Sequence, residues 1–78
     1  LKWLSLARNQ LEYLNSSIFF NFYKLSYLNL AENEIKQIST FAFHGLSNLI
    51  ELSLKSNNIK SLNDSLKFLV SVKYIFLN

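Results

Sequence analysis

The residues suited to acid–base or metal chemistry are few and lie far apart in the sequence. The chain has a single histidine, His44, a single aspartate, Asp64, and no cysteine. The other acidic residues are the glutamates Glu12, Glu32, Glu34 and Glu51. Nowhere do these residues form a Ser-His-acid set, a metal-ligand spacing or a glycine-rich phosphate loop. We therefore expect no catalytic site, no metal site and no cofactor, and we interpret His44 as a surface residue.

Large aromatic residues, in contrast, recur at a regular interval, and their chemistry is that of binding. Trp3 and Tyr27 are 24 residues apart, and Tyr74 follows Tyr27 after 47 more. Trp and Tyr are enriched in protein-binding hot spots, because they bury a large area with little loss of entropy and keep a polar group. A fold that superposes residues at this interval would gather these side chains into one patch.

The composition indicates one small packed domain. Of 78 residues, 50% are hydrophobic and 17% are charged, which favours a globular core and argues against disorder. No apolar run approaches the roughly 20 residues that a membrane span needs. The net charge of +3 comes from eight basic residues that are scattered singly, so nucleic acid is not a favoured partner. The lack of cysteine leaves the cellular compartment open.

The chain is built from a repeat of 24 residues. Three segments fit the pattern L-x-x-L-x-L-x-x-N-x-L/I, and they begin at Leu1, Leu25 and Leu49. A fourth begins at Val72, after a repeat of 23 residues. The predicted organisation is a single array with repeats at residues 1–24, 25–48 and 49–71 and a partial repeat at 72–78. Because the end coils of such an array need caps, we expect the chain to be an excerpt from a longer array.

This pattern resembles the leucine-rich repeat family over all 78 residues. The 24-residue length, with Phe19 and Phe43 at equivalent places, is similar to the typical class of extracellular proteins such as Toll-like receptors and Slit-like guidance proteins. The resemblance implies an α/β fold, a right-handed leucine-rich repeat solenoid that forms a horseshoe segment. A parallel sheet would line its concave side, and irregular or 3₁₀ turns its convex side. The third repeat departs from this class, since it is one residue shorter and has Leu66 in place of phenylalanine.

The residues themselves indicate the same elements. Apolar residues that alternate with other residues are typical of a strand with one buried face. Such pairs are Leu4/Leu6, Leu28/Leu30, Leu52/Leu54 and Ile75/Leu77. Because a return segment separates each strand from the next copy of the pattern, adjacent strands should pair in parallel, about 4.7–4.9 Å apart. The segments 17–23 and 40–45 have no strand or helix period and predict irregular or 3₁₀ turns.

An asparagine follows each complete strand pattern, at Asn9, Asn33 and Asn57. At this point the backbone N–H and C=O groups lose their strand partners, and an amide side chain can satisfy both kinds of group. The repeated position predicts a structural ladder in which each asparagine bonds its own turn and the next one. The alternative is that asparagine is simply a common turn residue.

The side chains between the leucines would lie on the concave face, which the family that the pattern resembles mostly uses for binding. The predicted partner-binding residues are Trp3, Ser5, Arg8, Tyr27, Asn29, Glu32, Glu51, Lys55, Tyr74 and Phe76. Arg8 and Glu32 could form an ion pair beside the aromatic residues. The alternative is that the aromatic residues are good sheet formers that pack against their cross-strand neighbours.

Two triplets, Asn15-Ser16-Ser17 and Asn63-Asp64-Ser65, match the N-glycosylation acceptor. Asn and Ser are abundant enough here for such triplets to arise by chance. Both asparagines nevertheless occupy the fifteenth position of their repeat, outside the strand. If the protein is secreted, we expect Asn15 or Asn63 to carry a glycan.

The predicted function is protein–protein interaction, as a ligand-recognition segment of an extracellular leucine-rich repeat receptor or adhesion protein. The expected partners are a protein ligand or co-receptor on the concave face and neighbouring repeats of a longer chain, with no direct membrane insertion by this segment. The alternative is an intracellular leucine-rich repeat scaffold or regulatory subunit. Repeats that act only as structural spacers are a third interpretation.

Overall fold

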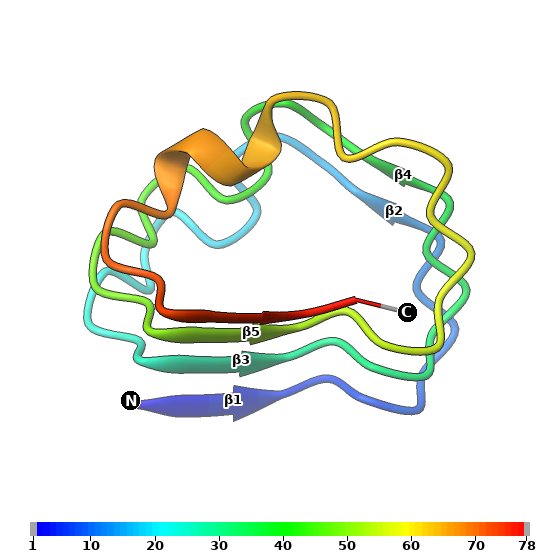
Figure 1. Cartoon of the computed structure of the whole chain (residues 1–78), viewed down its shortest axis with the longest axis horizontal. Coiled ribbons are helices and arrows are strands. Elements are labelled where there is room, and N and C mark those ends of the chain that lie inside the picture. Colours follow the sequence, from blue (N-terminus) through cyan, green and yellow to red (C-terminus); the bar gives the residue numbers. More distant parts are fainter. Residues whose placement is uncertain (1, 78) are drawn as a thin grey trace.

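The main sheet contains one short strand from each repeat. The computed structural model describes residues 2–77, and its strands β1 (Trp3–Ser5), β3 (Tyr27–Asn29), β5 (Glu51–Ser53) and β6 (Tyr74–Phe76) form one sheet in that order. All neighbouring strands are parallel. Figure 1 shows them side by side along one edge of the coil. Leu1 and Asn78, which begin the first predicted repeat and end the fourth, lie outside the described residues.

The register of the sheet places equivalent repeat positions next to one another. Leu4 pairs with Leu28, Leu28 with Leu52, and Leu52 with Ile75. These apolar side chains therefore form one straight file along the stacking direction of the coils. The predicted solenoid with a parallel sheet is confirmed.

The core fills the inside of the coil. Leu28, Leu30, Leu52 and Leu54 are at most 2% exposed, because alternation along each strand directs every second side chain inward. On the opposite side of the core, the rings of Phe19 and Phe43 stack at a centroid distance of 6.4 Å. The repeated apolar positions therefore pack against their own copies in the neighbouring coils.

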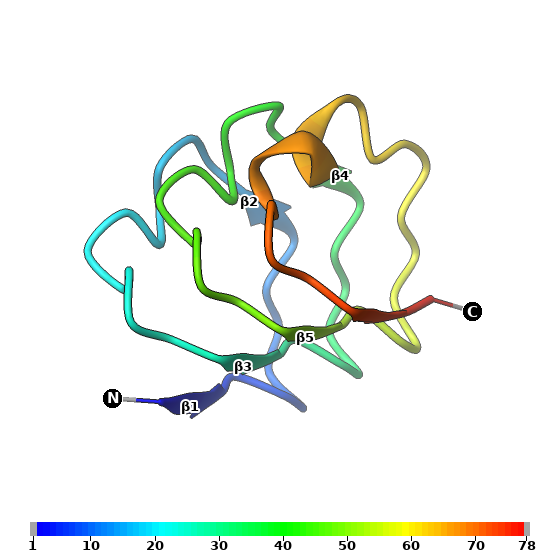
Figure 2. The same cartoon turned by 60° about the vertical axis from the view of Figure 1, so that its left-hand side comes forward.

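A second, smaller sheet was not predicted from the sequence. Strands β2 (Tyr13–Leu14) and β4 (Gln37–Ile38) pair in parallel, and Gln37 forms a further bridge with Ser61. Figure 2 shows these strands on the side of the coils away from the main sheet. Their pairing follows from the stacking of the coils, which brings equivalent extended segments of successive repeats next to each other.

The convex side consists of tight turns. In the first repeat the N–H of Phe20 bonds the carbonyl oxygen of Ser17 at 3.1 Å, and in the second the N–H of His44 bonds that of Phe41 at 3.2 Å. The 3₁₀ helix η1 (Ser65–Phe68) lies in the third repeat. The predicted segments 17–23 and 40–45 are turns, in which backbone N–H groups likewise bond the carbonyl oxygen three residues earlier. No helix in the described part of the chain is long and apolar enough to cross a membrane.

The chain leaves the sheet through a left-handed residue in three successive repeats. Arg8, Glu32 and Ser56 have φ angles of 60°, 56° and 57°. This conformation costs an ordinary L-residue roughly 1–2 kcal/mol, so the stacking of the coils must compensate for it. None of these three residue types indicates such a backbone from the sequence.

Candidate binding face

The outward side chains of the main sheet form an aromatic face. Trp3 is 59% exposed, Tyr27 40%, Tyr74 55% and Phe76 40%. Strand alternation explains why they point away from the core, since Leu4, Leu28 and Ile75 occupy the inward positions between them. We call this set, together with Glu51, Ser53 and Lys55, the concave face.

A shallow hollow of about 280 Å³ lies on this face and extends across the four strands. Its lining residues are Trp3, Tyr27, Leu28, Asn29, Glu51, Ser53, Lys55 and Phe76. It therefore brings together six of the ten residues that the sequence predicted for partner binding. The hollow is open to solvent and suits a protruding side chain of a partner better than an enclosed small molecule.

Four of the predicted residues lie outside the hollow: Ser5, Arg8, Glu32 and Tyr74. The Nε of Arg8 donates to Oε2 of Glu32 at 3.1 Å, with the two side chains 80% and 51% exposed. A pair this exposed contributes at most about 1 kcal/mol to stability.

Two polar side chains at the fifth repeat position bond the backbone just after the strand. Oδ1 of Asn29 accepts from the N–H of Ala31 at 3.0 Å, and Oγ of Ser5 accepts from the N–H of Ala7 at 3.3 Å. Ser53 occupies the same position and lines the hollow, although it was not among the predicted binding residues. Because Ser5 and Asn29 were predicted at this repeat position, the sequence could have indicated Ser53 as a binding residue too.

Asn33 is the most heavily bonded asparagine. Its Nδ2 donates to the carbonyl oxygens of Leu30 in its own coil and Leu6 in the preceding coil, both at 3.0 Å. Its Oδ1 accepts from the N–H groups of Asn9 at 3.1 Å and Leu11 at 3.2 Å. At 8% exposure, this side chain supplies partners to backbone groups of two coils away from bulk water.

Asn57 repeats this arrangement one coil further on. Its Nδ2 donates to the carbonyl oxygens of Leu54 at 3.0 Å and Leu30 at 2.9 Å, and its Oδ1 accepts from the N–H of Ile35 at 3.1 Å. The second coil in each case is the preceding one, not the next one as the sequence analysis expected. Asn9 bonds carbonyl oxygens of its own coil.

The two glycosylation triplets have different surroundings. Asn15 is exposed, whereas Nδ2 of Asn63 donates to the carbonyl oxygen of Ile38 in the preceding coil at 2.8 Å. Asn63 also has a left-handed φ of 52°. The hydroxyl of Ser65, in the same triplet, is buried and donates to the carbonyl oxygen of Leu62 at 2.6 Å.

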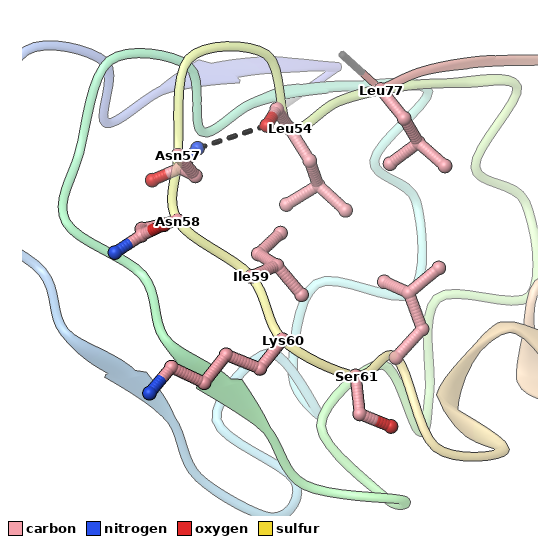
Figure 3. A pocket seen from close by; sticks show the side chains of 8 residues that line it. Leu54, Asn57, Asn58, Ile59, Lys60, Ser61 and Leu77 are labelled. Atoms are coloured by element: carbon pink, nitrogen blue, oxygen red, sulfur yellow. Dashed lines mark hydrogen bonds between the residues drawn. The ribbon is translucent and has the colours of Figure 1, made fainter.

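A larger hollow, of about 430 Å³, lies beside Leu54, Ile59, Leu62 and Leu77. Figure 3 shows Leu54 and Ile59 of the third repeat and Leu77 of the segment after β6 directed into it. In the second repeat the equivalent Leu30, Ile35 and Ile38 are fully buried. Ile59 and Leu62 are only half-buried, although they occupy repeat positions that lie inside the core one coil earlier.

The single histidine lies among aromatic rings on the convex side. His44 is exposed, and its ring centroid is 5.3 Å from those of both Phe20 and Phe68. Within residues 2–77 there is no cluster of three or more His, Asp or Glu side chains that could hold a metal ion. The arrangement suits hydrophobic packing between neighbouring turns.

Comparison with known proteins agrees with this geometry. The family model described as leucine rich repeat matches residues 1–49 and, again, residues 35–78, so the two matches cover the whole chain. A comparison with curated proteins gives no match. Repeats of this kind generally serve protein–protein interaction and are typically not catalytic. The chain belongs to the leucine-rich repeat family.

Proposed function

We propose that this chain recognises a protein ligand or co-receptor through its concave face, as part of an extracellular leucine-rich repeat receptor or adhesion protein. The observation that carries the proposal is the exposure of four large aromatic side chains on one short sheet. Each of them, Trp3, Tyr27, Tyr74 and Phe76, is at least 40% exposed. Exposed apolar patches of this kind are typical of interaction surfaces.

The packing of these four residues on one another is limited, although Trp3 and Tyr27 are partners in the sheet register. The close ring pairs in residues 2–77 all lie on the convex side or in the core, and none joins two of these four rings. Along the third repeat position, Glu51 separates Tyr27 from Tyr74 in the sheet register. All four residues therefore keep a large exposed surface for a partner.

The extracellular setting is supported by the position of Asn15. This asparagine is exposed and follows β2, which belongs to the smaller sheet rather than the main one. A glycan attached there would shield the side of the coil that Figure 2 shows away from the main sheet, and it would leave the concave face open. A loss of mass on glycosidase treatment of protein from its native host would support secretion, while its absence would favour the intracellular alternative.

The binding proposal can be tested by lysine substitution in the intact protein. A positive charge is placed in the aromatic face by each of four variants: Trp3→Lys, Tyr27→Lys, Tyr74→Lys and Phe76→Lys. We expect at least one of them to lower the amount of partner protein recovered with the intact protein by about tenfold or more. Tyr13→Lys is the matched control, because Tyr13 is also a tyrosine on a strand and is 52% exposed, but lies on β2. Unchanged recovery by all four folded variants would refute binding through this face.

A further inference from the structure

Glu51 differs from every other acidic residue of the chain. Four of the five acidic side chains are exposed: Glu12, Glu32, Glu34 and Asp64. Two of these form ion pairs with basic residues of a neighbouring coil. Glu51 is half-buried on the sheet, and its carboxylate has no hydrogen bond or ion pair within residues 2–77.

The residues around Glu51 are those that attract a cation. In the sheet register Glu51 lies between Tyr27 and Tyr74, and the hollow around it also includes Trp3 and Phe76. Aromatic faces attract Lys and Arg side chains within about 6 Å of the ring centroid. Because neighbouring strands are about 4.8 Å apart, a cation held above the Glu51 carboxylate can be within that distance of a flanking ring.

The one basic residue that lines the same hollow does not neutralise Glu51. Lys55 follows it by four positions, which corresponds to about 13 Å of extended chain. Its Nζ lies over the ring of Phe76, 6.0 Å from the centroid. The two charges therefore mark separate ends of the hollow, with the polar Ser53 between them in the sequence.

We propose that Glu51, with Tyr27 and Tyr74 on either side, is the binding site for a basic side chain, arginine or lysine, of the protein ligand. The inference rests on the proposed binding function and adds the chemistry of the partner. A half-buried carboxylate without a counter-charge has lost part of its hydration and gained no ion pair. A basic side chain supplies the missing charge, and its apolar stem or guanidinium plane packs on the tyrosine rings.

Peptide selection on the intact protein tests this assignment. Phage-displayed random peptides are selected on the unaltered protein and on its Glu51→Gln, Glu51→Lys and Tyr27→Ala variants. Glu34→Gln is the matched control, because it makes the same chemical change at an exposed glutamate outside the hollow. Glu51→Gln preserves size and shape, and a thermal melt of each variant checks that it is folded.

We expect the selected peptides to share an arginine or lysine. Synthetic copies should bind Glu51→Gln about tenfold more weakly and Glu34→Gln unchanged, and Glu51→Lys should select acidic residues instead. Some peptides could require Tyr27 but bind the Glu51→Gln variant as tightly as the unaltered protein. That result would contradict the assignment of Glu51 to a basic side chain and would still support binding through the concave face. Peptides that depend on neither residue would also overturn the assignment of Glu51, and the lysine variants of Trp3, Tyr74 and Phe76 would then test concave binding itself.

Discussion

Gly45 lies directly against the backbone of Phe20 in the preceding coil. A Cβ atom on Gly45 would be 2.7 Å from the carbonyl oxygen of Phe20 and 2.9 Å from its Cα. Gly45 also has a φ of +100°, a conformation that L-residues rarely adopt. The only glycine of the chain is therefore located where two convex turns approach too closely for a side chain.

Gly45→Ala should destabilise the protein by about 2–4 kcal/mol, because the added methyl group meets backbone atoms and the residue must keep a positive φ. Urea unfolding of the intact protein measures the change. Ser47→Ala, two residues away on an exposed position, is the control and should change stability by no more than about 0.5 kcal/mol. Equal stability of the two variants would show that the coils do not stack this closely.

Asn33→Ala should lower the free energy of unfolding by about 1–3 kcal/mol, because it removes partners from backbone groups of two coils. Asn33→Asp should also be destabilising, since a carboxylate cannot donate to the carbonyl oxygens of Leu6 and Leu30. Asn58→Ala, at an exposed asparagine in the following repeat, serves as the control. A comparable loss in Asn58→Ala would mean that asparagine acts here only as a general turn residue.

The left-handed backbone at Glu32 can be tested separately from its ion pair. Glu32→Val and Glu32→Asn both remove the contact with Arg8, but asparagine tolerates a positive φ and a β-branched residue does not. We expect Glu32→Val to be less stable than Glu32→Asn by about 1 kcal/mol in thermal or urea unfolding. If the two variants unfold alike, the φ of 56° does not constrain the residue type at this position.

Of the two glycosylation triplets, we expect Asn15 to carry the glycan and Asn63 to remain unmodified in secreted protein. The Nδ2 atom that would receive the sugar at Asn63 already bonds the carbonyl oxygen of Ile38. Glycopeptide mass spectrometry of protein from its native host gives the occupancy of each site. Asn63→Gln should also cost about 1 kcal/mol of stability, whereas Asn15→Gln should be neutral. A glycan on Asn63 alone would contradict this assignment.

The fold could be predicted because its main determinants repeat in the sequence. Leu4, Leu28 and Leu52 recur at one spacing, and alternation around them allows only a strand with one buried face. Residues 13–14 and 37–38 have no comparable pattern, so the smaller sheet was missed. Its strands are two residues long and pair because the stacked coils place them together.

The candidate site was only partly predictable. The 24-residue repeat is sufficient to predict that Tyr27 and Glu51 lie side by side on one face. In the structure, the two residues are partners in the pairing of β3 with β5. That Glu51 lacks a counter-charge depends on where Lys55 directs its side chain, which sequence spacing does not determine. Likewise, both triplets match the same acceptor pattern, and only the structure distinguishes them, through the bond from Asn63 to Ile38 and the buried hydroxyl of Ser65.

Photo-crosslinking tests binding through the concave face most directly. A photoreactive phenylalanine analogue replaces Tyr27 in one form of the intact protein and Tyr13 in another, because both tyrosines lie on strands and are 40% and 52% exposed. Each form is irradiated in its native host, and the covalent adducts are identified by mass spectrometry. We expect a specific partner protein to be attached at position 27 and not at position 13. The same partner attached at position 13 and absent from position 27 would contradict the concave face as the binding surface.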